Sequence, residues 1–150
     1  MKTTITTSTE MGASNKAVFV DASALVALYY RADSHTKKAD SISAQLAKQD
    51  TPLITTNHVV AEALTIVSQR AGKKHAVVLG NDVWHGGIMS VVHLDKATEL
   101  GAFDLFATMR QKNVSFVDCS CFVLCEQLGI KQVFGFDKHF AKQGFKLLKP

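Results

Sequence analysis

The stretch Ala17-Val18-Phe19-Val20-Asp21-Ala22-Ser23-Ala24-Leu25 decides the fold of this chain, because a short apolar run ends abruptly in polar residues before apolar residues resume. A short, uninterrupted apolar run is typical of a strand that is covered on both faces. The polar break at Asp21 and Ser23 favours a strand over 17–20 followed by a helix over 23–31. The stretch is too interrupted for a membrane span.

The same alternation of short apolar runs and longer helical patterns continues to the end of the chain. Further strands are predicted at 52–55, 89–92, 114–117, 132–134 and 145–148, and further helices at 36–49, 57–71, 73–84, 96–111 and 119–128. Strands that are each followed by a helix form a parallel sheet with helices on both faces. The predicted fold class is therefore α/β, a three-layer α/β/α sandwich with a mainly parallel central sheet.

The bulk composition fits one globular domain, since the chain has 150 residues, 47% of them hydrophobic and 20% charged. We expect this domain over 17–150, preceded by a flexible leader rich in Thr and Ser over 1–16. The leader lacks the continuous apolar core of a secretory signal, so a cytoplasmic location is expected. The formal net charge of +4 is compatible with a polyanionic partner.

The cysteines and most of the histidines show no metal-ligand spacing. Cys119, Cys121 and Cys125 lie in one short segment, with no second pair to complete a zinc site. We expect these cysteines to be reduced side chains packed in the core. Five scattered histidines are assigned no catalytic role: His35, His58, His75, His85 and His93.

Three aspartates fall where predicted strands end. Asp21 and Asp118 each directly follow a strand, and Asp137 lies just beyond the next one. In an open parallel sheet, ligands bind outside the carboxyl ends of the strands. These aspartates, although far apart in the sequence, are therefore expected to face one crevice.

Glu62 is an acid in an apolar setting. It lies within the predicted helix over 57–71, where its same-face neighbours Val59 and Ile66 are apolar. A carboxylate buried there is costly unless a cation compensates it. No basic residue lies within a turn of Glu62 on this helix, which favours a metal ion as the compensating charge.

Each acid taken alone also has a structural interpretation. Asp21 and Asp118 fit as helix N-caps, Asp137 as a turn residue and Glu62 as a paired core acid. No capping box supports either N-cap, because Ala24 and Cys121 stand three residues later, where Glu or Gln is needed. The convergence of all four at one sheet edge favours a site instead. Clustered carboxylates raise one another's pKa, and Mg²⁺ or Mn²⁺ would remove that penalty and promote phosphodiester cleavage.

The acidic segments resemble the motifs of PIN domains. The matching segments are Phe19-Val20-Asp21-Ala22-Ser23-Ala24-Leu25, Ala61-Glu62, Ser115-Phe116-Val117-Asp118-Cys119 and Phe136-Asp137-Lys138-His139-Phe140. The segment over 115–145 is similar to the toxin ribonucleases of VapBC toxin–antitoxin systems. The resemblance runs from residue 17 to the C-terminus and leaves out the leader.

The resemblance implies an Mg²⁺- or Mn²⁺-dependent endoribonuclease, the toxin of a type II toxin–antitoxin system. Its catalytic, metal-binding acids would be Asp21, Glu62, Asp118 and Asp137. Ser23 and Ser120 would line the site as small hydroxyl residues, and Lys138 and His139 are candidate phosphate contacts. The implied partners are an RNA substrate, an antitoxin protein that plugs the site, and a second copy of the chain in a homodimer.

Two other enzyme and signalling classes fit the sequence less well. A haloacid-dehalogenase-type hydrolase needs Asp-x-Asp after the first strand, where this chain has Asp21-Ala22-Ser23. A response-regulator receiver needs an acidic pair near the first strand and a lysine after the last, and that pattern is incomplete. The remaining alternative is a catalytically silent PIN-fold module that binds RNA or protein. The presence of all four acids argues against it.

Overall fold

A central sheet of five parallel strands organises the computed structural model, which describes residues 16–150. The strands are β1 (Val18–Val20), β2 (Leu53–Thr56), β3 (Ser90–Val92), β4 (Gln132–Phe134) and β5 (Lys146–Leu147). Their order in the sheet is β3-β2-β1-β4-β5, and every neighbouring pair is parallel. The predicted leader, apart from Lys16, lies outside the described residues.

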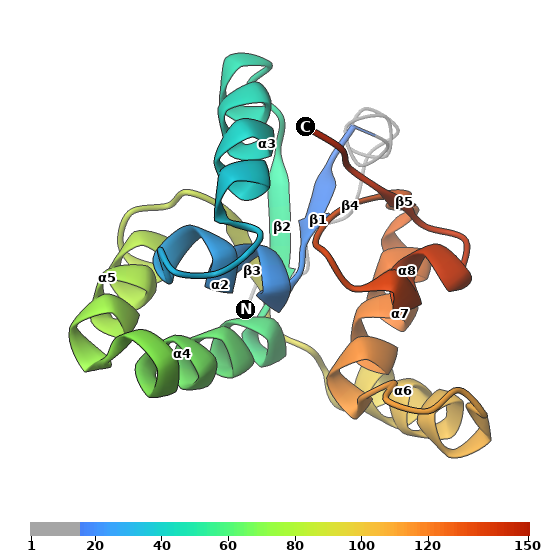
Figure 1. Ribbon diagram of the computed structural model, residues 1–150. Helices are drawn as coiled ribbons and strands as arrows, with labels where there is room; N and C mark the ends of the chain where they lie inside the picture. Colours follow the sequence, from blue (N-terminus) through green and yellow to red (C-terminus); the bar gives the residue numbers. More distant parts are fainter. Residues whose placement is uncertain (1–15) are drawn as a thin grey trace.

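Seven helices among the described residues cover the two faces of the sheet (Figure 1). They are α2 (Ala22–Tyr29), α3 (Thr36–Lys48), α4 (Asn57–Ala71), α5 (Lys73–Trp84), α6 (Lys96–Thr108), α7 (Phe116–Leu128) and α8 (Lys138–Lys142). Helices α2 to α5 lie on one side and α6 to α8 on the other, which confirms the predicted three-layer α/β/α sandwich. None of the helices described is long and apolar enough to cross a membrane.

The strand order reverses at β1, which lies between β2 and β4. Crossover helices leave in opposite directions at such a switch point, and a crevice opens at the carboxyl ends of the strands there. The backbone N–H of Asp21 donates a 2.9 Å hydrogen bond to the carbonyl of Phe134, which ties the exit of β1 to the end of β4. The topology thus brings the segments after β1 and β4 together.

The predicted strand over 114–117 is wrong, because this segment begins helix α7. Ser115 is the N-cap: its Oγ accepts from the N–H of Asp118 at 3.0 Å, and the Asp118 carboxylate accepts from the N–H of Ser115 at 2.9 Å. This reciprocal pair is a capping box carried by Ser115-x-x-Asp118. Both N–H groups are satisfied locally, and the apolar residues between them join the first helical turn.

The core is aliphatic and aromatic, and it includes the three cysteines. Phe19, Phe134 and Phe140 are among its largest fully buried side chains. All three cysteines are free and fully buried, which confirms the prediction of reduced core side chains. The core supports the sheet from both faces, so the residues at the strand ends are held on a rigid base.

Candidate active site

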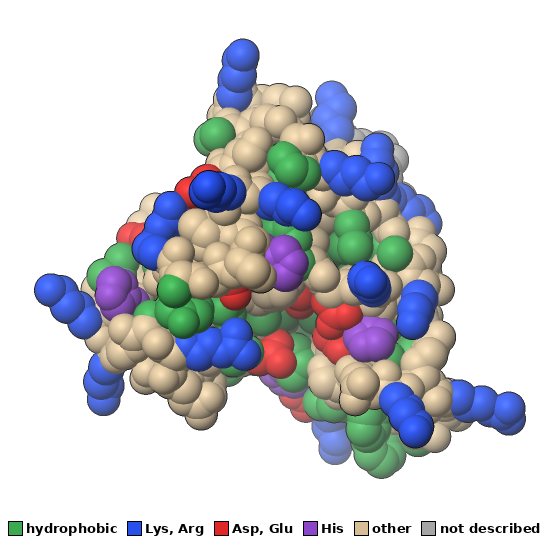
Figure 2. All heavy atoms as spheres, viewed as in Figure 1, with side chains coloured by type: hydrophobic (Ala, Val, Ile, Leu, Met, Phe, Trp, Pro, Cys, Tyr) green, Lys and Arg blue, Asp and Glu red, His purple; other side chains and the backbone are tan. Residues whose placement is uncertain are grey.

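A cleft of about 510 Å³ lies at the carboxyl ends of β1 and β4. All four predicted acids line it: Asp21, Glu62, Asp118 and Asp137. They come from the N-cap of α2, the middle of α4, the first turn of α7 and the N-cap of α8. Figure 2 shows acidic side chains gathered in a hollow at the centre of this face. The structure therefore brings together acids that lie far apart in the sequence.

Asp21 is both a helix cap and a cleft residue. Its Oδ2 accepts a 2.8 Å hydrogen bond from the hydroxyl of Ser23 and a 3.4 Å bond from the N–H of the same residue. Burial raises the pKa of the Asp21 carboxyl to about 6, although the hydrogen bonds from Ser23 lower it in part. Asp21 therefore acts as a helix cap and also belongs to the site. A nearby cation would stabilise the ionised form of its carboxyl.

Glu62 projects from α4 toward the three aspartates. Burial, followed by the negative charges of Asp21, Asp118 and Asp137, raises the pKa of Glu62 to about 7. Its helical neighbour Ile66 also lines the cleft, as the apolar face of this helix predicted. Without a cation, a carboxyl with this pKa is close to half protonated at neutral pH.

Asp118 and Asp137 complete the acidic group from the other side of the sheet. Burial raises the pKa of Asp118, against the hydrogen bonds from Ser115 that lower it. Asp137 accepts a 2.9 Å hydrogen bond from the N–H of His139 and so caps the short helix α8, an element that the sequence did not predict. The Asp137 side chain is 31% exposed, so it is open to an incoming ligand.

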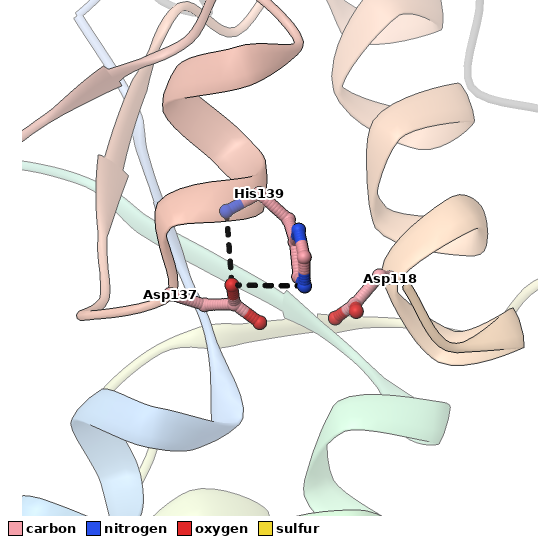
Figure 3. A group of neighbouring side chains, drawn as sticks. All are labelled: Asp118, Asp137 and His139. Carbon is pink, nitrogen blue, oxygen red and sulfur yellow. Dashed lines mark hydrogen bonds and ion pairs between the residues drawn. The ribbon is translucent and has the colours of Figure 1, made fainter. Parts of the chain in front are cut away.

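His139 lies against the same two aspartates (Figure 3). Ligand atoms of Asp118, Asp137 and His139 lie within 4.8 Å of one another, and His139 Nε2 is 3.8 Å from Asp137 Oδ1. A metal-bound histidine usually donates its second ring N–H to an acceptor. Nδ1 of His139 is buried and has no partner among the described residues. We therefore place the proton on Nε2, which faces the carboxylates at a distance too long for a hydrogen bond, and do not count His139 among the residues that would bind the metal.

The two serines expected at the site differ in placement. Ser23 lines the cleft: its hydroxyl donates to Asp21, and its oxygen accepts a 2.9 Å hydrogen bond from the N–H of Phe136. Ser120 is fully buried, its hydroxyl donates to the carbonyl of Val117 at 2.6 Å, and it is not among the residues that line the cleft. Only Ser23 is therefore in a position to act on the acids directly.

Sequence reasoning missed further side chains of the cleft, and Arg70 and His35 are among them. Arg70 follows Glu62 by eight residues on α4, so the helical repeat places it on the same face, a signal that was present in the sequence. His35 also lines the cleft, and its ring is stacked on Phe136 with centroids 4.4 Å apart and planes at 13°. Nothing in the spacing of His35 along the chain indicates this contact, because the two residues belong to different loops.

The residues of the cleft fit a hard divalent cation. Four carboxylates converge, and burial, with a smaller contribution from the charges of the neighbouring acids, raises the pKa of three of them. Among the described residues that line the cleft, Arg70 is the one Lys or Arg. Oxygen donors of this kind suit Mg²⁺ or Mn²⁺ better than they suit zinc.

Comparisons with known proteins agree with this geometry. The family model of the PIN domain matches residues 18–146. The 23S rRNA-specific endonuclease VapC20 of Mycobacterium tuberculosis is 27% identical over 133 residues, covering 89% of this chain and 98% of the relative, and the protein of the same name from a second strain matches equally. The crystal structure of Mycobacterium tuberculosis VapC20, a sarcin-ricin loop cleaving toxin, is similar with a TM-score of 0.80 and 27% identity, covering 89% of this chain and 99% of that one.

Proposed function

The chain belongs to the PIN domain family, and from this premise we propose that it is a metal-dependent endoribonuclease, the toxin of a type II toxin–antitoxin system. The observation that carries the proposal is the convergence of Asp21, Glu62, Asp118 and Asp137 in one cleft. The likeness to VapC20, which is named as an endonuclease, over 89% of the chain supports the same reaction.

The residues of this chain hold the reacting groups in place. The four acids would bind the Mg²⁺ or Mn²⁺, which when bound activates water and neutralises charge on the phosphate. Ser23 orients Asp21, and the capping box orients Asp118. Both aspartates lie at helix N-termini, where the helix dipole stabilises their negative charge and favours an approaching phosphate. Arg70 supplies a cation for the RNA backbone.

The proposed substrate is RNA, and the loop cut by VapC20 is the first sequence to test. VapC20 is a toxin that cleaves the sarcin-ricin loop, and its likeness to this chain in sequence and fold supports the same RNA as a substrate here. Specificity in such small domains rests on the shape of a loop, so a hairpin is a better probe than an unstructured strand alone.

The proposal includes a cytoplasmic location, an antitoxin protein and a homodimer. Large apolar side chains remain exposed on two helices and give such partners a surface to bury. They are Val77, Val78 and Trp84 on α5, and Leu100, Phe103 and Phe106 on α6. Exposed apolar groups of this size commonly mark protein–protein contacts.

Cleavage of a sarcin-ricin-loop hairpin and of a mixed single-stranded RNA pool tests the function. The protein, freed of any antitoxin, is assayed with Mn²⁺, with Mg²⁺ and with EDTA. We expect cleavage that requires metal and is reduced at least about a hundredfold in Asp118→Asn, the scale on which catalytic electrostatics act. Asp104→Asn, on the exposed surface of α6, is the matched control and should cut like the wild type.

The silent binding module predicts a different result. RNA would be bound by the wild type and by Asp118→Asn alike, and no form would cut either RNA with either metal. That outcome, obtained with folded protein, would replace the nuclease proposal.

A further inference from the structure

We propose that the stacked side chains His35 and Phe136 form a base-binding subsite of the cleft, on which an unpaired RNA base stacks beside the phosphate to be cut. We call this pair the stacking platform. The inference rests on the proposed endoribonuclease function and adds to it a specificity determinant outside the four acids.

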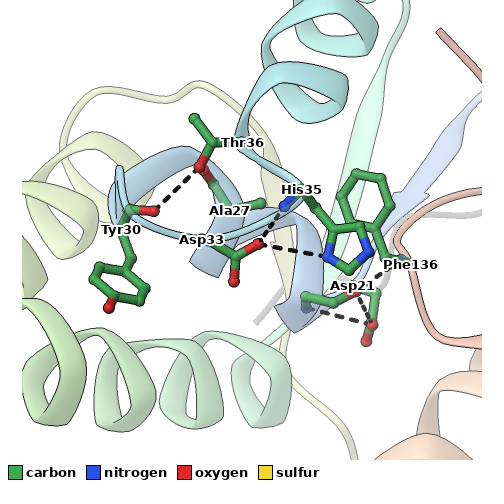
Figure 4. A network of polar contacts seen from close by, with 8 residues as sticks. Asp21, Ala27, Tyr30, Asp33, His35, Thr36 and Phe136 are labelled. Atoms are coloured by element: carbon green, nitrogen blue, oxygen red, sulfur yellow. Dashed lines mark hydrogen bonds and ion pairs between the residues drawn. The ribbon is translucent and has the colours of Figure 1, made fainter.

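The platform presents an open aromatic surface at the cleft. The rings of His35 and Phe136 are nearly parallel, at 13°, with centroids 4.4 Å apart. The His35 side chain is nevertheless 44% exposed, so the ring is covered by Phe136 on one side and reaches solvent on another. Figure 4 shows both rings beside Asp21, and all three residues line the cleft.

His35 is held in place before any ligand arrives. Its backbone N–H donates to Asp33 Oδ1 at 2.8 Å, and its Nδ1 lies 3.5 Å from the same oxygen. The next residue, Thr36, is buried, and its hydroxyl is 2.8 Å from the carbonyl of Ala27, which anchors the loop to α2. A side chain fixed in this way loses little conformational entropy when a base binds.

Helix stability does not explain a histidine at this position. His35 is the N-cap of α3, and its side chain makes no capping hydrogen bond. Ser, Thr, Asp and Asn are the residues whose side chains cap and stabilise a helix at this position. The imidazole instead faces the cleft, which favours a role in binding.

Phe136 is linked to Asp21 through two hydrogen bonds in series. The N–H of Phe136 donates to Ser23 Oγ at 2.9 Å, and the Ser23 hydroxyl donates to Asp21 Oδ2 at 2.8 Å. The preceding residue is Gly135, where an added Cβ would stand 2.9 Å from the Cβ of Asp21. This close approach fixes the distance between the platform and the acids, so a base on the platform places its own phosphate at a set distance from them.

The chemistry of the platform fits RNA. Proteins bind unpaired bases by stacking them on aromatic side chains, histidine included. Such stacking tolerates any base, but a purine offers a larger face than a pyrimidine. We therefore expect a preference for a purine at one nucleotide next to the cut.

The first test measures stacking without cleavage. In the Asp118→Asn background with Mg²⁺, 2-aminopurine is placed in turn at each nucleotide around the cut in the sarcin-ricin-loop hairpin. At one of these positions, the fluorescence of 2-aminopurine should be quenched when the protein binds the RNA. His35→Ala should abolish that quenching and weaken binding about tenfold, as expected for the loss of one stacked base. His35→Phe should restore both, and His85→Ala, an exposed histidine after α5, should change neither.

The second test pairs the protein change with an RNA change. In the protein that keeps Asp118, His35→Ala should raise the KM for RNA cleavage about tenfold and leave kcat little changed. On RNA that is abasic at the quenched nucleotide, wild type and His35→Ala should be cut equally. The subsite would be overturned if His35→Ala lost as much kcat/KM on abasic RNA as on intact RNA, or if 2-aminopurine were quenched at no position. Either result would show that the stacking platform only joins two loops. Wild type that neither cuts nor binds RNA would instead overturn the proposed function, and the subsite with it.

Discussion

The acids of the cleft are costly to ionise in the folded chain, chiefly because they are buried and in part because they lie close together. The carboxyl of Asp21 has a pKa of about 6 in the folded chain against an ordinary value of 3.8, and that of Glu62 about 7 against 4.5. An unfolded chain releases both protons at lower pH than the folded chain does. The folded state therefore loses stability as pH rises through the interval between these values.

These raised pKa values predict how the stability of the folded chain depends on pH. In EDTA, the free energy of unfolding should fall by about 2 kcal/mol between about pH 4 and pH 7 through the raised pKa of Asp21. Asp21→Asn, which keeps a capping oxygen without the charge, should remove this contribution, leave that of Glu62, and be more stable than the wild type at neutral pH. Urea denaturation at steps of pH, with Asp104→Asn as the control, provides the measurement. An equally steep fall in Asp21→Asn would assign the effect to other groups.

The sequence predicted the acids better than it predicted their neighbours. Asp21 and Asp137 follow strands and Glu62 lies on an apolar helix face, as predicted, and both patterns are local signals. Asp118 also reaches the cleft, but from the first turn of α7 and not from the end of the predicted strand. His35 reaches the cleft only because the loop before α3 folds onto the loop after β4. Such a contact between loops has no periodicity along the chain, so it needed the three-dimensional structure.

Among the elements, helices with clear ends were predicted well and the start of α7 was not. The ranges of α4 and α5 match the prediction, because Gly72 between them has a φ of +98° that ends one helix before the next begins. The segment over 114–117 is rich in Val and Phe and has the composition of a strand. Its capping box is visible only when the pattern is counted from Ser115, whereas the prediction counted forward from Asp118.

The capping box makes a prediction at the scale of this element. Ser115→Ala removes the acceptor for the N–H of Asp118, and loss of a helix cap costs about 0.5–2 kcal/mol. The backbone N–H of Ser115 still donates to the Asp118 carboxylate, but the weakened first turn of α7 holds this carboxylate less firmly, so RNA cleavage should also fall, with metal binding weakened. Ser68→Ala, on the exposed surface of α4, should affect neither property. Thermal unfolding and cleavage rates measured side by side check both effects, and normal cleavage in folded Ser115→Ala would show that Asp118 is oriented by other contacts.

At the scale of the whole molecule, the strand order assembles the site, and the outer helices expose apolar side chains. Four separate segments meet at the reversal of strand order at β1, so no single segment contains the active site. On the outer layer, α6 exposes Leu100, Phe103 and Phe106, which recur every three residues along one side of the helix. A repeat of this kind is typical of a helix face that packs against another surface.

The exposed face of α6 predicts the state of association. If this face joins the two copies of the proposed homodimer, Phe103→Ser should shift the protein toward the monomer in analytical ultracentrifugation. Val77→Ser, a comparable change of an exposed apolar residue on α5, is the control and should leave the dimer intact. Dissociation by Val77→Ser alone would move the interface to α5.

Three of the four acids also begin helices, since Asp21 and Asp137 are N-caps and Asp118 belongs to a capping box. Asparagine keeps the oxygen that a cap needs but loses the charge that a metal needs. A single G-to-A transition in an aspartate codon makes this exchange. The gene is thus one nucleotide away, at three separate codons, from a product that folds but lacks a charge that the proposed metal site needs. Cells under selection to escape the proposed toxin are expected to yield these alleles as stable, soluble protein rather than as truncations.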